Sequence, residues 1–125
     1  MASRKHLLVI DEHLPTVDSL VDHFAPDYAV YTALNGHDGL IVVRRTRPDL
    51  VVLEIDLTDM GGLDVLREIK RLAPSTPVIV LTASAEVRVA TEALKMGAFA
   101  YLAKPASLQY LDHLVAAALR IATAS

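Results

Sequence analysis

Several side chains that could do chemistry come directly after short apolar runs of this sequence. Carboxylates follow the first and third runs, a hydroxyl the fourth and an ammonium group the fifth; these residues are Asp11, Glu12, Glu54, Asp56, Thr82 and Lys104. Crowded carboxylates repel one another, and a hard divalent cation with oxygen ligands, most naturally Mg²⁺, relieves that repulsion. A hydroxyl and a lysine suit the oxygens of a phosphoryl group. These residue types together indicate a Mg²⁺-dependent phosphoryl site, or the relic of one.

The elements that must position these side chains alternate between two kinds. Continuous apolar runs, typical of strands buried on both faces, lie at residues 7–10, 28–32, 50–53, 78–81 and 99–102. Apolar residues at helical spacing lie at 17–24, 40–45, 63–72, 87–95 and 108–122. Five β-α units predict an α/β fold with one parallel sheet and helices on both faces. Ligands bind such sheets at the carboxyl ends of the strands, where the six polar residues fall.

Residues at the ends of the expected helices agree with this division. Asn35 and Asp38 form a predicted N-terminal capping pair, and Ser107 is a predicted N-cap for the last helix. Pro48 should end the second helix, and Gly97 stands where the fourth should end. These boundaries are marked independently of the apolar pattern.

Length and composition restrict the class of protein. The 125 residues predict one domain over 1–125, with 1–5 and 122–125 as frayed tails. A net charge of −3 argues against direct contact with nucleic acid, and the absence of cysteine excludes disulfide scaffolds, thiol catalysis and zinc ribbons. The longest apolar stretch has six residues, far short of the roughly 18 to 20 that span a bilayer. We expect a cytoplasmic domain that does not enter a membrane.

Five stretches of the chain, in order, resemble the receiver domain of two-component response regulators. They are 8–12, 48–54, 60–66, 78–83 and 97–105, and they lie at the spacing of that family. The resemblance covers essentially the whole chain and points to the nitrogen-regulation branch of enhancer-binding regulators. It implies a flavodoxin-like, doubly wound (βα)5 fold with the strand order 2-1-3-4-5.

The resemblance also implies roles for the acidic residues. Asp11 and Glu12 match the acidic pair that holds Mg²⁺, and the backbone carbonyl of Asp56 matches a further metal ligand. Glu54 matches the aspartate that accepts the phosphoryl group and that also faces the metal. The expected cofactor is therefore a weakly bound Mg²⁺.

The remaining matched residues belong to the switch of that family. Thr82 matches the hydroxyl that binds the phosphoryl group, and Lys104 matches the lysine that pairs with its oxygens. Tyr101 matches the aromatic residue that turns inward when the hydroxyl moves. Pro105 matches a proline that usually follows a cis peptide bond.

The chain departs from the family pattern at three positions. The acceptor is Glu54 instead of aspartate, in a register fixed by Gly62 eight residues later. The second member of the acidic pair is Glu12 instead of aspartate, and Thr58 stands where a proline is usual. These departures place the phosphorylation chemistry in question.

The longer side chain at the acceptor position has two expected consequences. One extra methylene moves the Glu54 carboxylate by about 1 Å, and a misplacement of that size can cost roughly 100-fold in rate. Glu54 should therefore be a poor phosphoacceptor. Lys104 and Thr82 could also bind its carboxylate directly, which would mimic the phosphorylated state.

The function expected from the sequence is an atypical, non-enzymatic receiver that regulates an attached or partner output. The alternatives are a conventional but slow phosphoacceptor, and a flavodoxin-like domain that binds a phosphate-bearing ligand. A sensor histidine kinase or a phosphotransfer protein is an expected partner. A face built from 87–95, 99–102 and 108–120 is expected to contact an output domain or a second copy in a weak homodimer.

Overall fold

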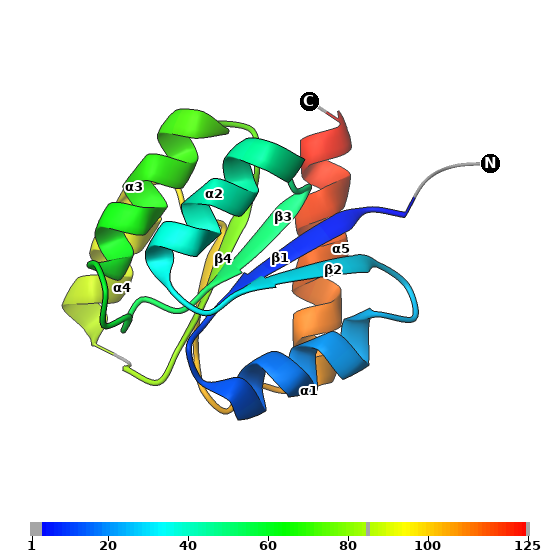
Figure 1. The fold of residues 1–125 in the computed structure, drawn as a ribbon, viewed down its shortest axis with the longest axis horizontal. Helices are drawn as coiled ribbons and strands as arrows, with labels where there is room; N and C mark the ends of the chain where they lie inside the picture. Colours follow the sequence, from blue (N-terminus) through cyan, green and yellow to red (C-terminus); the bar gives the residue numbers. More distant parts are fainter. Residues whose placement is uncertain (1–3, 85, 125) are drawn as a thin grey trace.

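The computed structural model describes residues 4–84 and 86–124, which form strands and helices in strict alternation (Figure 1). The strands are β1 (His6–Ile10), β2 (Ala29–Ala33), β3 (Leu50–Leu53), β4 (Val78–Thr82) and β5 (Ala100–Ala103). The helices are α1 (Leu14–Phe24), α2 (Gly36–Thr46), α3 (Gly62–Leu72), α4 (Val87–Lys95) and α5 (Leu108–Ala124). Every run predicted as a strand forms a strand, and every segment predicted as a helix lies in a helix. Strands β2 and β5 start one residue later than expected.

The five strands form one parallel sheet in the order β2-β1-β3-β4-β5, which confirms the expected flavodoxin-like topology. Ile10 lies level with Leu53 across the β1–β3 pair, and Thr82 lies level with Ala103 across the β4–β5 pair. Because the strands are parallel and in this register, the residues after β1, β3, β4 and β5 meet at one edge.

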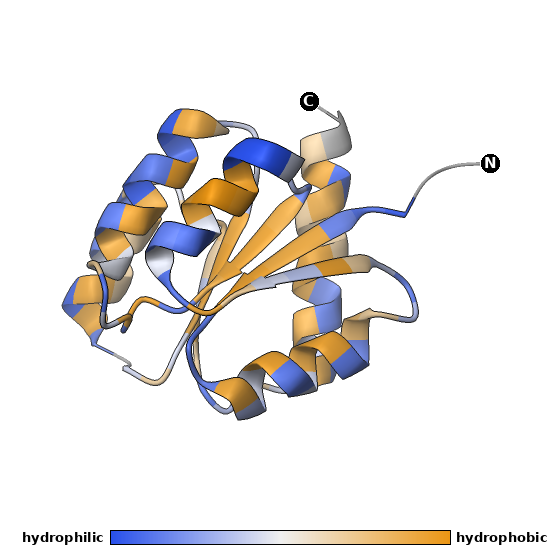
Figure 2. Cartoon of the chain, in the orientation of Figure 1, coloured by the Kyte–Doolittle hydropathy of each residue, from blue (hydrophilic) through white to orange (hydrophobic). Residues whose placement is uncertain are grey.

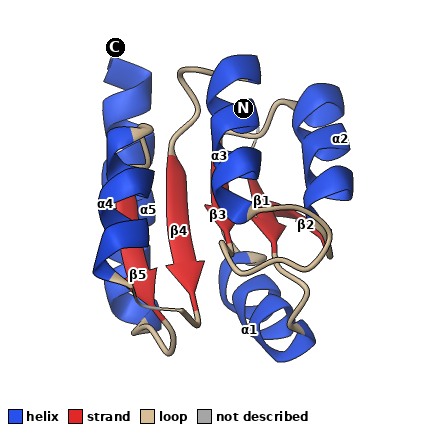
Figure 3. Cartoon of the chain, turned by 90° about the vertical axis from the view of Figure 1, so that its left-hand side faces the viewer, coloured by secondary structure: helices blue, strands red, loops and turns tan. Residues whose placement is uncertain are grey.

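The helices cover the sheet in two layers with separate apolar cores (Figures 1 and 3). Leu8 and Ile10 face α2, α3 and α4, whereas Leu7 and Val9 face α1 and α5. Alternate residues of a strand point to opposite faces, so both faces of β1 must be apolar. Figure 2 shows the same pattern, with apolar central strands and helices whose polar faces point outward.

The predicted capping residues are found at the helix ends. The Asn35 side chain accepts a hydrogen bond from the Asp38 backbone N–H at 2.8 Å, and the Ser107 hydroxyl accepts one from the Tyr110 N–H at 3.2 Å. Gly97 follows α4 with a φ of 104°, a conformation that glycine adopts at little cost. These boundaries fix where each connecting loop begins.

The ends of the described chain differ partly from expectation. Residues 122–124 continue α5 instead of forming a frayed tail, in agreement with the high helix propensity of alanine in this segment. Residues 1–3 and 125 of the expected tails lie outside the described residues. Within 4–84 and 86–124, no helix combines the length and apolar character that crossing a bilayer requires.

Candidate functional site

Backbone hydrogen bonds at the carboxyl edge of the sheet place the predicted site residues beside one another. The N–H of Glu54 donates to the carbonyl of Ile10 at 2.9 Å, which puts Glu54 next to Asp11. The N–H of Lys104 donates to the carbonyl of Thr82 at 2.8 Å. The loops that follow four different strands therefore share one small volume.

Burial distinguishes three of these residues from the other polar groups of the described chain. Among residues 4–84 and 86–122, the buried polar or charged side chains are Asp11, Glu54 and Thr82, with 3%, 4% and 0% of their surface exposed. Charged groups are rarely buried unless they are paired. The sequence pattern had selected all three as candidate site residues.

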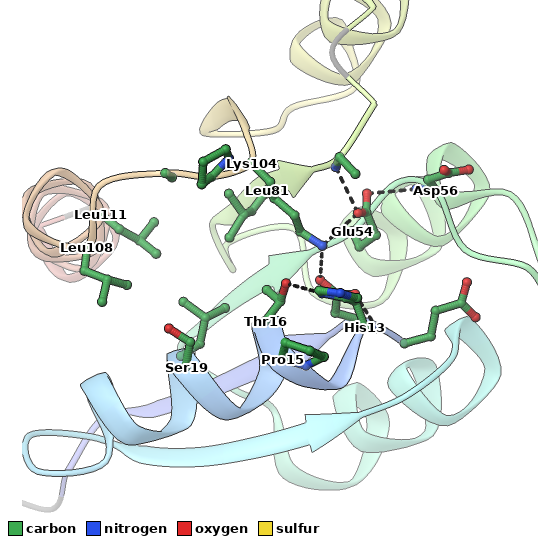
Figure 4. Close-up of a pocket in the computed structure, with 16 residues that line it drawn as sticks. His13, Pro15, Thr16, Ser19, Glu54, Asp56, Leu81, Lys104, Leu108 and Leu111 are labelled. Atoms are coloured by element: carbon green, nitrogen blue, oxygen red, sulfur yellow. Dashed lines mark hydrogen bonds and ion pairs between the residues drawn. The ribbon is translucent and has the colours of Figure 1, made fainter.

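Lys104 supplies the counter-charge for both buried carboxylates. Its Nζ lies 2.7 Å from Oδ2 of Asp11 and 3.0 Å from Oε1 of Glu54, and its side chain is 15% exposed. Figure 4 shows Lys104 reaching down from the loop after β5 toward Glu54. Asp11, Lys104 and Glu54 thus form a triad, in which one ammonium group is shared by two carboxylates.

Backbone amides complete the contacts of the Glu54 carboxylate. Its Oε1 accepts a hydrogen bond from the Ala83 N–H at 3.1 Å, and its Oε2 accepts one from the Asp56 N–H at 3.0 Å. Burial alone would raise the pKa of Glu54. The hydrogen bonds from Asp56, Thr82, Ala83 and Lys104 outweigh burial and hold the pKa of Glu54 below its ordinary value. Glu54 is therefore a carboxylate anion at neutral pH.

The charge of Lys104 is set by the same contacts. Burial by itself lowers the pKa of this ammonium group, but hydrogen bonds and the charges of Asp11 and Glu54 raise the pKa above its ordinary value. Lys104 is therefore protonated throughout the physiological range.

The other oxygen atoms that could bind a metal have protein partners as well. Oδ1 of Asp11 accepts a 2.9 Å hydrogen bond from the His13 N–H. Oε2 of Glu12 accepts a 2.8 Å hydrogen bond from the Thr58 hydroxyl. Across the described residues, no three His, Asp or Glu side chains converge in a way that would hold a metal ion. As these side chains lie, the donor set does not fit the expected Mg²⁺ site.

Asp59 anchors the loop that follows Glu54, a role that the sequence pattern did not reveal. Its carboxylate accepts hydrogen bonds from the N–H groups of Gly36 and His37 at 2.9 and 3.0 Å, and it contacts the His37 ring at 2.9 Å. Burial would raise the pKa of Asp59, but these hydrogen bonds and one from the Met60 N–H lower it well below its usual range. The β3–α3 loop is thereby held on the N-terminus of α2.

Tyr101 and Thr82 form hydrogen bonds with the β4–α4 loop. The hydroxyl of Tyr101 donates a 2.7 Å hydrogen bond to the carbonyl of Ser84, whose N–H donates to Oγ1 of Thr82 at 3.1 Å. Burial and the negative charges of Glu54 and Glu86 raise the pKa of Tyr101, so its hydroxyl stays protonated and remains a donor. The first residues of this loop, Ala83 and Ser84, therefore contact both Glu54 and Tyr101.

A cavity of about 740 Å³ opens beside the triad and continues between α1 and α5. Ser19 and Leu20 line it from α1, and Leu108 and Leu111 line it from α5 (Figure 4). Solvent and small solutes can therefore approach the buried carboxylates from this side.

Two expectations about the geometry of the site are met, the roles of its residues stay predictions, and other contacts were missed. Glu54 lies within direct contact of Lys104, and the bond between Lys104 and Pro105 is cis. Asp56 contributes its N–H to Glu54, while the predicted role of its carbonyl stays a prediction. The Ala83 N–H and the Thr58 hydroxyl were missed as contacts. Almost every residue carries a backbone N–H, so residue type could not reveal the Ala83 contact. Thr58 departs from the family pattern, and that departure was the available sign of its contact with Glu12.

A doubly wound five-stranded sheet with buried carboxylates, a hydroxyl and a lysine at its carboxyl edge is the architecture of a receiver domain. The chain belongs to the family of response regulator receiver domains, whose pattern it matches over residues 7–116. It is 37% identical over 116 residues to the transcriptional regulatory protein ZraR of Salmonella typhimurium, an alignment that covers 90% of this chain and 26% of that protein. This similarity supports the predicted nitrogen-regulation-like branch.

Solved structures agree with this assignment. A CheY-like receiver domain from Methanospirillum hungatei superposes with a TM-score of 0.93 at 26% identity, covering 97% of this chain and 98% of that one. A response regulator from Burkholderia pseudomallei, solved with a phosphorylated aspartic acid, a calcium ion and citrate, superposes with a TM-score of 0.81 at 30% identity, covering 92% of this chain and 66% of that one.

Family membership establishes the general role of the domain. Receiver domains are regulatory switches of two-component signalling that interact with histidine kinases and output domains, and they typically bind Mg²⁺ at the phosphorylation site. The chain spans about a quarter of the length of the curated relatives that it matches. The activities of those longer proteins are therefore not assigned to it.

Proposed function

We propose that this receiver domain is preset by Glu54 and regulates its output without phosphorylation. The observation behind the proposal is the position of one oxygen atom, Oε1 of Glu54, which lies 3.0 Å from Nζ of Lys104 and 3.1 Å from N of Ala83. An ammonium group and a backbone N–H are the donors that stabilise a phosphoryl oxygen. Glu54 therefore offers these donors an anionic oxygen that belongs to the chain itself.

The β4–α4 loop provides a route from this carboxylate to the surface. Glu54 binds the N–H of Ala83, and Tyr101 binds the carbonyl of Ser84, so two adjacent residues of the loop are held from both sides. Helix α4 begins at Val87, three residues beyond Ser84. A change in the charge or length of residue 54 is thus transmitted to α4 and β5.

The face made by α4, β5 and α5 is the surface on which we expect the output to act. Val87 and Leu94 lie seven residues apart on α4 and are 83% and 50% exposed, and Tyr110 on α5 is 53% exposed. Arg88 and Lys95 supply charges on the same helix. Apolar side chains mixed with charges suit a reversible contact with an output domain or a second copy.

The family assignment supports a proposal for the partners and location of the switch. A sensor histidine kinase or a phosphotransfer protein remains a candidate partner through the family, although a preset site gains little from either. Because the similar protein from Salmonella typhimurium is named a transcriptional regulatory protein, we place this domain in the cytoplasm, with the chromosome. We expect its output domain, and not the receiver itself, to make any contact with DNA.

Other functions receive less support from the site. A flavodoxin-like ligand domain would need to accept a phosphate group near Asp11 and Glu12, where negative charge repels it. A slow, conventional phosphoacceptor would attack with a carboxylate oxygen, but both oxygens of Glu54 already accept hydrogen bonds. These contacts compete with the reorientation that attack requires.

Sedimentation of the unmodified chain beside Glu54→Gln tests the proposal. Glutamine keeps the size of the side chain but removes the charge that attracts Lys104. We expect a weak homodimer for the unmodified chain, little change on addition of beryllofluoride with Mg²⁺, and weaker dimerisation of Glu54→Gln. A monomer that dimerises only with beryllofluoride would show that Glu54 leaves the switch off.

A further inference from the structure

The acidic residues matched to the metal site bind hydrogen-bond donors from the protein itself. Each of the three carboxylates matched to the metal site accepts at least one hydrogen bond, and two of them share the ammonium group of Lys104. We propose that the Lys104 ammonium group takes the place of the divalent cation, so that the triad is stabilised without Mg²⁺.

The distances at Lys104 support this replacement. Its Nζ lies 2.7 Å from Asp11 and 3.0 Å from Glu54, so one cation bridges two buried carboxylates. The extra methylene of Glu54 extends its carboxylate toward Lys104. With this contact made, one positive charge already offsets the repulsion between the two carboxylates, which is the repulsion that a divalent cation would relieve.

Two departures from the family pattern contact each other and remove a third oxygen donor. Glu12 replaces the usual aspartate, Thr58 replaces the usual proline, and the Thr58 hydroxyl donates to Oε2 of Glu12 at 2.8 Å. Proline has no hydroxyl that could donate this bond. The contact therefore depends on the change at position 58, and it directs Glu12 toward the β3–α3 loop.

This inference is independent of the preset switch, because a metal titration does not measure the state of the α4–β5–α5 face. Calorimetric titration with Mg²⁺ alone and thermal unfolding with and without Mg²⁺ test it. We expect no binding heat and no change in Tm for the unmodified chain at about 10 mM Mg²⁺, a concentration well above the Kd of ordinary weak carboxylate sites.

Removal of the ammonium group should create a metal site. In Lys104→Met the two buried carboxylates lose their counter-charge, so we expect Mg²⁺ to bind with a Kd of about 1 mM and to raise Tm by about 5 °C at 10 mM. Lys104→Arg keeps the charge and should not bind Mg²⁺. Lys5→Met removes an exposed lysine near the opposite edge of the sheet and serves as the control.

The outcomes of the titrations distinguish a failure of this proposal from a failure of the preset switch. Mg²⁺ binding to the unmodified chain would overturn the proposal, as would the absence of binding in a folded Lys104→Met variant. If Lys104→Met does not fold, Lys104→Gln repeats the test, because its amide can still donate a hydrogen bond to Asp11. A Glu54→Gln variant that still dimerises would contradict the preset switch but would leave the titration result unaffected.

Discussion

The hydroxyl of Tyr101 donates a 2.7 Å hydrogen bond to the backbone carbonyl of Ser84 and thereby joins β5 to the loop that precedes α4. The ring of Tyr101 also packs on the apolar core between the sheet and helices α2, α3 and α4. The residue therefore has two separable functions: its ring fills space, and its hydroxyl fixes the loop. Removing the hydroxyl alone isolates the second.

Tyr101→Phe should loosen the β4–α4 loop and leave the ring packing intact. The loss of one hydrogen bond is expected to reduce the free energy of unfolding in urea by about 1 kcal/mol and to speed amide exchange at Ala83 and Ser84. Tyr110→Phe, at an exposed tyrosine on α5, is the matched control and should change neither quantity. Unchanged exchange in Tyr101→Phe would mean that the hydroxyl does not hold the loop.

Glu54 should remain unlabelled when the chain is incubated with acetyl phosphate and Mg²⁺. Both oxygens of its carboxylate accept hydrogen bonds, and the extra methylene is expected to misplace the carboxylate for attack on the phosphorus. Glu54→Asp shortens the side chain and should restore an acyl phosphate that mass spectrometry detects. Rapid stoichiometric labelling of the unmodified chain would refute this expectation, whereas a folded but unlabelled Glu54→Asp would implicate Glu12 and the metal.

Asp59 should stabilise the domain at neutral pH and lose this effect in acid. Its pKa in the folded chain lies below the value of about 3.9 expected when unfolded, so the stabilisation is complete above pH 4 and declines as pH falls through the lower value. Asp59→Ala should cost about 1 kcal/mol at pH 7, and less below pH 4. Urea unfolding beside Asp22→Ala, at an exposed position on α1, checks this; an equal loss at every pH would contradict it.

Gly62→Ala should destabilise the segment that follows Glu54. A Cβ atom at Gly62 would overlap the backbone oxygen and Cα of Ile55, and a backbone contact cannot be relieved by a rotamer change. We expect a loss of at least about 1–3 kcal/mol in the free energy of unfolding. Gly61→Ala is the control, because its added Cβ meets only the Asp64 side chain, at 3.1 Å; similar losses in both variants would argue against the backbone contact.

The parallel sheet and its shared edge were predictable because buried parallel strands appear as continuous apolar runs, whereas the strand order followed from the resemblance to receiver domains. The runs at 50–53 and 78–81 are apolar at every position, as strands covered on both faces must be. The weaker runs were placed with a one-residue error at β2 and β5, where burial is incomplete and the pattern is correspondingly less sharp.

The sequence predicted which residues form the site better than it predicted which of their atoms contact one another. Asp11, Glu54 and Lys104 could be assigned to one edge from the order of the elements, and the structure brings them together. The link between Glu12 and Thr58 depends on the path of two loops, which residue types alone do not determine. The same holds for Asp59, whose capping of α2 connects positions 23 residues apart.

The contact between Glu54 and Lys104 is made by atoms of the polypeptide, so no hydrolysis can remove either partner from the folded chain. A phosphoryl group on a carboxylate is lost by hydrolysis, and that loss ends the signal after a defined time. A preset domain needs no phosphoryl group, so hydrolysis does not set the duration of its signal. Under the proposed preset state, the strength of the output would follow the number of copies in the cell, and synthesis and proteolysis would exert the control that a kinase and a phosphatase exert elsewhere.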